Sequence, residues 1–250
     1  MKTIARYLSI LMMILLLVTC AGGKKAEKKV WVMGLEEHFQ LGFDAAGRGN
    51  LEEAVSEYKE VLRLDPKNSR AHLNLGILFG RQGQWKQEIS EYKRAIEIDP
   101  NFAEAYFNLG VAYTERGDLE EATVQYQKAL QINPNYVEVH NNLGIIHFRQ
   151  GRIDKAFSEY QKALEIKPDY ARGYFNVGNL YRQKGNLDEA IASFQKALEI
   201  YPNYGEAHYH LALIYFENQK YELAIQHTDE AERLGIVVDP TVLMRLKPYR

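Results

Sequence analysis

The chain of 250 residues contains a single cysteine and carries a formal net charge of only −2. One cysteine, Cys20, excludes an internal disulfide framework. Acidic and basic residues are interspersed and leave no basic face for nucleic acid, so no nucleic-acid partner is predicted. The sequence also lacks a phosphate-binding loop, a nucleophile elbow and a Cys/His catalytic pair. We therefore predict no enzyme activity, no cofactor and no small-molecule substrate.

The apolar run near the start of the chain is short. It extends from Leu8 to Val18, far less than the roughly 20 residues that span a bilayer as a helix. Two basic residues, Lys2 and Arg6, precede it. A positive start followed by a short apolar core is typical of a secretory signal peptide, which we place at residues 1–20.

The signal segment ends in Leu17-Val18-Thr19-Cys20, which resembles a bacterial lipobox. In that motif the cysteine becomes the lipidated first residue of the mature protein. The resemblance implies lipidation at Cys20 and a place at the cell envelope, as an outer-membrane lipoprotein facing the periplasm. Thr19 departs from the motif, in which Gly, Ala or Ser precedes the cysteine. The alternative is an ordinary signal peptide that is cut nearby, which would remove Cys20 and leave a soluble periplasmic protein.

The segment that follows, residues 21–34, is rich in small and charged side chains and has little to bury. We predict a flexible charged tether here.

Proline is scarce, but five of the seven prolines are regularly spaced. Successive members of the set differ by 34 in residue number: Pro66, Pro100, Pro134, Pro168 and Pro202. A fixed period of this size marks a repeat architecture. With Leu35 at the first place, the period defines six units, 35–68, 69–102, 103–136, 137–170, 171–204 and 205–238, and leaves residues 239–250 outside the repeat.

Other columns of the repeat predict two helices in each unit. The seventh and eighth places read Leu-Gly in the first four units, as in Leu41-Gly42, and the twentieth place is alanine in five of six units. Small residues at these places let two antiparallel helices approach closely. Glycines at the fifteenth place, such as Gly49, mark the end of the first helix. Glu88 departs from the alanine column, so its carboxylate must reach water or a partner.

These columns resemble the tetratricopeptide repeat family over residues 35 to about 238. The resemblance implies an all-α fold, a right-handed superhelical solenoid of six helical hairpins whose first helices line a concave groove. It also implies that the groove binds a protein or an extended peptide. After the repeat, Asp239-Pro240 and the apolar residues Val242, Leu243 and Leu246 predict a short C-terminal helix that caps the last hairpin.

Helical spacing directs the second, fifth, sixth, ninth and thirteenth places of each first helix toward the groove. The sixth place is the most regular: Gln40, Asn74, Asn108, Asn142, Asn176 and His210. An amide carries donors and an acceptor, so a ladder of asparagines can pair with the backbone of a strand-like segment. The alternative is that these side chains are simply solvated. Phe107 and Asn141 at the fifth place and Asn179 at the ninth complete the predicted binding residues.

Histidines recur at the fourth place, as His38, His72, His140 and His208. We interpret them as planar core fillers and predict no metal site. His140 and His147 lie two helical turns, roughly 10 Å, apart along one helix, which is too far to share an ion.

The identity of the partner is open. The second place mixes both charges, which disfavours the lysine-rich clamp that some relatives use for chaperone C-termini. Six repeats behind a lipobox resemble the pilotin-type lipoproteins of type IV pilus assembly, which help a secretin reach the outer membrane. The alternatives are a periplasmic adaptor for cell-wall remodelling enzymes and, from another class, an accessory subunit of a transferase.

Overall fold

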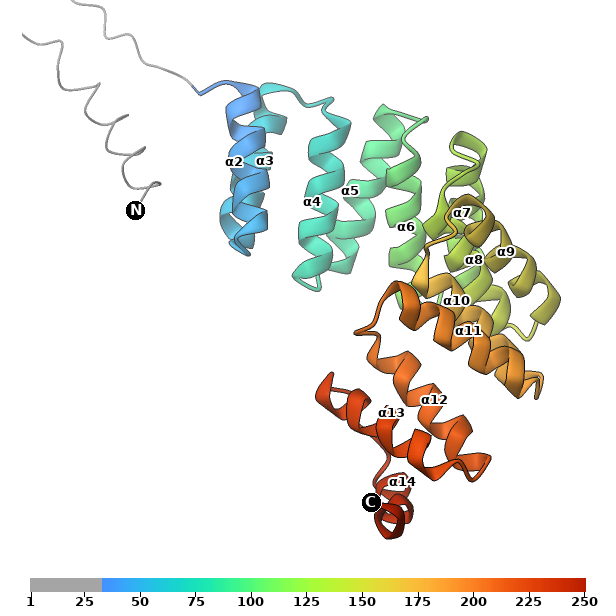
Figure 1. The fold of residues 1–250 in the computed structure, drawn as a ribbon. Helices are drawn as coiled ribbons and strands as arrows, with labels where there is room; N and C mark the ends of the chain where they lie inside the picture. The colour runs from blue at the N-terminus through green and yellow to red at the C-terminus, as the bar shows by residue number, and fades with distance from the viewer. Residues whose placement is uncertain (1–32) are drawn as a thin grey trace, which may run out of the picture. The chain divides into compact units, whose positions relative to one another are not determined.

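The computed structural model describes residues 33–250, which fold into helices (Figure 1). These residues contain thirteen α-helices, one short 3-10 helix and no strand. Residues Leu35–Arg250 form one compact unit. No helix among residues 33–250 combines the length and the apolar character that crossing a membrane requires. The predicted signal peptide, the predicted lipidation site Cys20 and most of the predicted tether lie outside the described residues.

Each 34-residue unit folds into a hairpin of two helices. The first helices begin at the first place of each unit and are α2 (Leu35–Gly47), α4 (Ser69–Arg81), α6 (Ala103–Arg116), α8 (Val137–Arg149), α10 (Ala171–Gln183) and α12 (Gly205–Glu217). The second helices begin at the seventeenth place and are α3 (Leu51–Leu64), α5 (Trp85–Ile98), α7 (Leu119–Ile132), α9 (Ile153–Ile166), α11 (Leu187–Ile200) and α13 (Tyr221–Arg233).

The hairpins follow one another in chain order, from blue to red in Figure 1. The two helices of a hairpin contact each other most extensively, and each second helix packs against the next first helix. After the sixth hairpin come α14 (Pro240–Leu246) and the 3-10 helix η1 (Lys247–Tyr249). The predicted fold class, an all-α solenoid of helical hairpins, is confirmed.

A tight turn joins the two helices of each hairpin. In the first five hairpins its left-handed position is glycine, with a φ of 78° at Gly49 and 81° at Gly117. Glycine has no Cβ to clash in this conformation, which explains why the column ends the first helix. The sixth hairpin has Gln219 at the same place with a φ of 59°. Such a conformation costs an ordinary residue about 1–2 kcal/mol.

Eighth-place glycines receive an aromatic ring from the second helix of their own hairpin. A Cβ added at Gly110 would lie 2.6 Å from the ring of Tyr126, and one at Gly178 would lie 2.7 Å from the ring of Phe194. Both rings are fully buried. Because glycine lets the ring reach the helix backbone, this column sets the close approach of the two helices.

Fourth-place histidines do more than fill the core, because they join the two helices of a hairpin. Three Nδ1 atoms each lie 2.6 Å from a carboxylate oxygen of the second helix, in the pairs His38–Glu57, His72–Glu91 and His140–Glu159. Burial opposes ionisation of Glu159, but hydrogen bonds from His140 and Lys162 outweigh it and hold its pKa below the usual range. In the sixth hairpin the partner of His208 is another histidine, His227, at 2.8 Å.

Glu88, which replaces alanine at the twentieth place, is accommodated beside a glycine and forms a hydrogen bond with a tyrosine. A Cβ on Gly80 would lie 2.7 Å from Oε1 of Glu88, so the glycine makes space for the carboxylate. Burial and the nearby charge of Glu115 raise the pKa of Glu88, and a hydrogen bond with Tyr92 partly offsets them. The carboxylate is therefore held between α4 and α5 and not turned fully outward.

The C-terminal helix α14 covers the apolar end of the last hairpin. Leu246 is fully buried and Val242 nearly so, and both belong to one cluster with Leu211 of α12. The Asp239 side chain accepts a hydrogen bond of 2.7 Å from the backbone N–H of Thr241 and so caps the helix.

Candidate protein-binding face

The first helices α2, α4, α6, α8, α10 and α12 form a surface that we call the first-helix face. The predicted sixth-place residues lie on these helices but differ in their contacts. Gln40 is exposed, and its Nε2 donates to Asp44 of the same helix at 2.9 Å. Asn108 donates from Nδ2 to the Glu104 carbonyl at 2.8 Å. The side chain of Asn74 makes no hydrogen bond within residues 33–250.

A chain of hydrogen-bonded side chains connects the third, fourth and fifth hairpins on this face. Asn176 donates from Nδ2 to Oδ1 of Asn141 at 2.7 Å, and Asn141 donates to Asn142 at 3.4 Å. Asn142 donates to the hydroxyl of Tyr126 at 3.1 Å, and that hydroxyl lies 3.2 Å from the hydroxyl of Thr114. Asn141 is 0% exposed, so it positions Asn176 and Asn142 from below the surface.

His210, the last member of the sixth-place column, is held between an aromatic ring and a guanidinium. Its ring stacks on Phe194 with centroids 5.3 Å apart, and Nδ1 lies 2.8 Å from Nη1 of Arg182. Burial, together with the positive charge of Arg182, lowers the pKa of His210 to about 4. The ring is therefore neutral at pH 7, and its Nδ1 accepts a hydrogen bond that orients Arg182.

Phe107 is half-buried and packs against two tyrosines. Its centroid lies 5.0 Å from that of Tyr136 and 6.2 Å from that of Tyr126. The Phe107 ring therefore packs against Tyr126, whose hydroxyl accepts the hydrogen bond from Asn142. The assignment of Phe107 and the sixth-place residues to a binding surface stays a prediction. Within residues 33–250, no three His, Cys, Asp or Glu side chains are grouped as a metal site requires.

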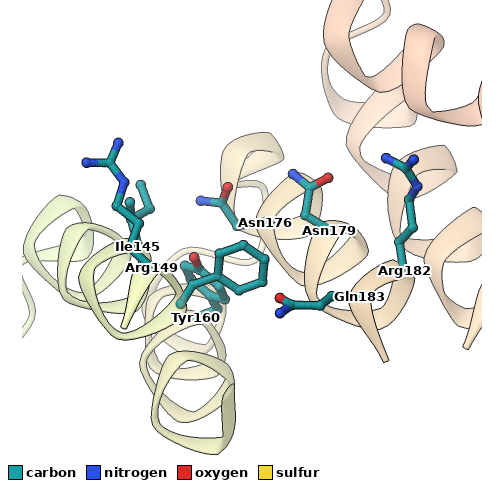
Figure 2. A pocket seen from close by; sticks show the side chains of 8 residues that line it. Ile145, Arg149, Tyr160, Asn176, Asn179, Arg182 and Gln183 are labelled. Atoms are coloured by element: carbon teal, nitrogen blue, oxygen red, sulfur yellow. The ribbon is translucent and has the colours of Figure 1, made fainter. Parts of the chain in front are cut away.

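An open pocket of about 690 Å³ lies on the first-helix face between the fourth and fifth hairpins. Ile145, Phe148 and Tyr160 supply its apolar part. Its polar side chains come from α8 and α10: Arg149, Asn176, Asn179, Arg182 and Gln183. Figure 2 shows the two arginines on opposite sides of the pocket, with Asn176 and Asn179 between them. Two of the predicted binding residues, Asn176 and Asn179, therefore meet in one pocket.

The charged residues of this pocket were not among the predicted binding residues. Arg149 occupies the thirteenth place, which was expected to face the groove, and Arg182 occupies the twelfth, which was not. The side chain of Arg149 makes no ion pair or hydrogen bond within residues 33–250. The lining of the pocket thus combines two guanidinium groups with amides and contains no carboxylate. Such a site can bind an anionic or amide-bearing group over an apolar floor.

Stacked helical hairpins with a polar first-helix face define a helical-repeat protein of the scaffold class. A model described as TPR repeat matches residues 47–83, 78–115 and 112–151. Two models described as tetratricopeptide repeat match residues 135–203 and 175–236. The chain belongs to the tetratricopeptide repeat family, whose members are generally non-catalytic scaffolds that bind peptides or proteins.

Several solved structures share this fold. The crystal structure of MamA is 34% identical, covers 64% of this chain and 94% of its own, and superposes with a TM-score of 0.57. PilF of Pseudomonas aeruginosa is 25% identical, with coverages of 72% and 83% and a TM-score of 0.67. YrrB, described as a TPR protein with an unusual peptide-binding site, is 21% identical, with coverages of 76% and 97% and a TM-score of 0.56, a likeness of fold alone. No curated protein matches the chain.

Proposed function

We propose that this chain is a non-enzymatic scaffold that holds an extended segment of a partner protein along its first-helix face. The observation that carries the proposal is the pocket on this face, where the side chains of Asn179 and Arg149 make no hydrogen bond or ion pair within residues 33–250. Packed helices lie about 8–10 Å apart, and an extended segment advances about 3.3 Å per residue. Successive sixth-place amides can therefore meet such a segment about every third residue.

Site-specific photocrosslinking in cells tests which face the partner meets. A photoreactive amino acid replaces Asn108 or Asn142 on the first-helix face, and Gln127 or Gln161, exposed on the second helices of the same hairpins, in matched controls. We expect a crosslinked product from the two asparagine positions and not from the two glutamine positions. Equal products from both faces, or products from the second helices alone, would contradict the proposal.

The asparagines are tested separately by substitution. Asn142→Ala removes its hydrogen bonds with Tyr126 and Asn141, and Asn108→Ala removes one to its own helix, while no apolar core side chain is changed. We expect the yield of crosslink from a photoreactive group at Gln183 to fall in the double variant. An unchanged yield would discard the asparagine ladder and leave the solvated alternative.

We also propose that the chain is anchored at the outer membrane through a lipidated Cys20 and faces the periplasm. The lipobox-like Leu17-Val18-Thr19-Cys20 supports this proposal. Several acyl chains together anchor a protein stably, because each buried methylene contributes about 0.8 kcal/mol. Metabolic labelling with a fatty-acid analogue should mark the wild-type chain, and Cys20→Ala should release it from membranes. An unlabelled, soluble wild-type chain would instead favour the periplasmic alternative.

For the pathway, we propose a pilotin-type role in which the bound partner belongs to a pilus secretin. The support is the architecture, six repeats after a lipobox-like segment, and the likeness to PilF of Pseudomonas aeruginosa. Mass spectrometry of the product crosslinked at Asn108 identifies the partner. A secretin subunit is the expected result, whereas a cell-wall hydrolase would favour the adaptor role and a transferase the accessory-subunit role.

A further inference from the structure

We propose that the pocket between α8 and α10 takes the side-chain carboxylate of an aspartate or glutamate in the bound segment. This inference rests on the proposed function and adds the chemistry of the partner. It makes Arg149 and Arg182 the residues that select the segment, while the sixth-place amides hold its backbone.

The placement of the two guanidinium groups is the first argument. They stand on opposite sides of the pocket, with Asn176 and Asn179 between them (Figure 2). A carboxylate entering there can accept charge-assisted hydrogen bonds from either guanidinium and a neutral one from Asn179. Nδ2 of Asn176 is already engaged with Asn141, so this amide presents its oxygen toward the backbone N–H groups of a bound segment.

The charge balance of the pocket is the second argument. No carboxylate lines it, and Arg149 has no acidic partner in the part of the chain that the structure describes. Among residues 33–250, the one polar contact of Arg182 is with His210, a neutral ring at pH 7 that orients the guanidinium without cancelling its charge. The pocket therefore keeps two positive charges next to an apolar floor of Ile145 and Phe148.

These two features together point to a peptide and not to a free polyanion. The whole chain carries a net charge of −2, which gives no broad positive field to attract nucleic acid. The positive charge is local, and it adjoins apolar surface that a neighbouring apolar side chain of the same segment can cover. An acidic residue beside an apolar one in an extended peptide matches both parts of the pocket.

Selection from a random peptide library tests the inference with the full-length chain. Decapeptides are displayed within a phage coat protein, so that no free terminus contributes a carboxylate. The wild-type chain, the pocket variant Arg149→Gln/Arg182→Gln and the control Arg63→Gln/Arg94→Gln, with the same change of charge on second helices, are compared. We expect the wild type and the control to enrich Asp and Glu at one position of the peptide, and the pocket variant to lose that enrichment.

A synthetic, C-terminally amidated copy of the leading wild-type peptide then gives affinities by fluorescence anisotropy. Replacing its enriched acid by the matching amide should weaken binding about tenfold or more. The single variant Arg149→Gln should weaken it as well, and because its side chain is exposed and unpaired within residues 33–250, loss of folding does not explain the loss. In the pocket variant, the acidic peptide and its amide copy should bind equally.

The outcomes separate the inference from the proposed function. If peptides are selected without an acidic preference, or if the pocket variant keeps that preference, the inference is overturned and the scaffold role stands. If the wild-type chain selects no peptide at all, the proposed function fails and the inference fails with it. Much tighter binding of a phosphoserine peptide than of the acidic one would also overturn it, since the pocket would then serve a phosphate group.

Discussion

The first five hairpins and the sixth share one register, but different side chains join the two helices within each hairpin. In each of the first five, an eighth-place glycine faces an aromatic ring, whereas the sixth has Ala212 at that place and Thr228 in place of the ring. The fourth-place histidine pairs with a carboxylate in three of the five, and with His227 in the sixth. The left-handed turn residue changes from glycine to Gln219.

These differences show that two places of the repeat that contact each other change together. Where the eighth place is no longer glycine, the facing aromatic ring is absent as well. The methyl group of Ala212 occupies space that a ring would fill, and Thr228 is small enough to turn its hydroxyl back to the Ala224 carbonyl at 2.6 Å. The sixth hairpin also lacks a seventh hairpin to pack against, and α14 contributes Leu246 to its core instead. An inner hairpin is therefore held by its own glycine and ring, and the last one depends more on the cap.

The largest effect is expected from removing the anchor of the cap. Leu246→Ala deletes a fully buried side chain at the edge of the solenoid. Large-to-small core substitutions of this kind cost about 2–5 kcal/mol, and in a repeat protein the loss stays near the affected unit. Native-state hydrogen exchange should show faster exchange in α13 and unchanged exchange in α7.

Met244→Ala is the matched control, because Met244 lies in the same helix and is 72% exposed. It should change the stability of the sixth hairpin by no more than about 0.5 kcal/mol. If Leu246→Ala behaved like this control, or if α7 opened as readily as α13, the cap would not be what holds the sixth hairpin.

A smaller effect is expected within the first five hairpins, where replacing a helical glycine by alanine should lower the stability and not raise it. Gly178→Ala places a Cβ 2.7 Å from the buried ring of Phe194. Alanine in a helix normally gains about 1 kcal/mol over glycine, but overpacking a core costs about 1–3 kcal/mol. We expect a net loss of about 1–2 kcal/mol, measured as a lower urea midpoint or faster exchange in α10 and α11.

Gly47→Ala is the control for helix propensity. Gly47 ends α2, and a Cβ added there meets nothing within 4 Å. This variant should be neutral or slightly more stable. A stabilising Gly178→Ala would mean that the fifth hairpin can accommodate a Cβ at the eighth place as the sixth does with Ala212, and this distinction between the two regions would disappear.

Much of the fold was predictable because the same physical requirement recurs in every unit. The proline column that begins with Pro66 and Pro100 and the glycines at the turns each mark a helix end in five units, so a local ambiguity in one unit is resolved by the others. Glu88 was recognised as a misfit from its column alone. How the carboxylate is accommodated was not predictable, because Gly80 provides the space and Tyr92 the hydrogen bond from other places of the repeat.

The candidate site was predictable only in part. Helical spacing identified the face and included Asn176 and Asn179, which meet in the pocket. Arg182 was missed because it is oriented by His210, which follows it by 28 residues and belongs to the next hairpin. Asn141 was expected on the surface, but the packing of neighbouring first helices buries it. Such contacts depend on how neighbouring hairpins pack against each other. The spacing of residues along one helix carries no information about that packing.

The last expected effect is a pH dependence of the sixth hairpin, where two histidines face each other. Burial, together with the facing His208, lowers the pKa of His227 to about 4. The unfolded chain therefore takes up this proton more readily than the native state does. The contribution of His227 to stability is fully present above its ordinary pKa of about 6.5 and is lost as the pH falls toward 4.

His227→Glu restores the histidine–carboxylate pair of the other hairpins and should reduce this loss. Exchange in α13, corrected for intrinsic pH effects, between pH 7.5 and 4.5 measures it, with α7 as the internal control. Equal pH dependence in the wild type and the variant would show that the pairing of two histidines does not distinguish the last hairpin.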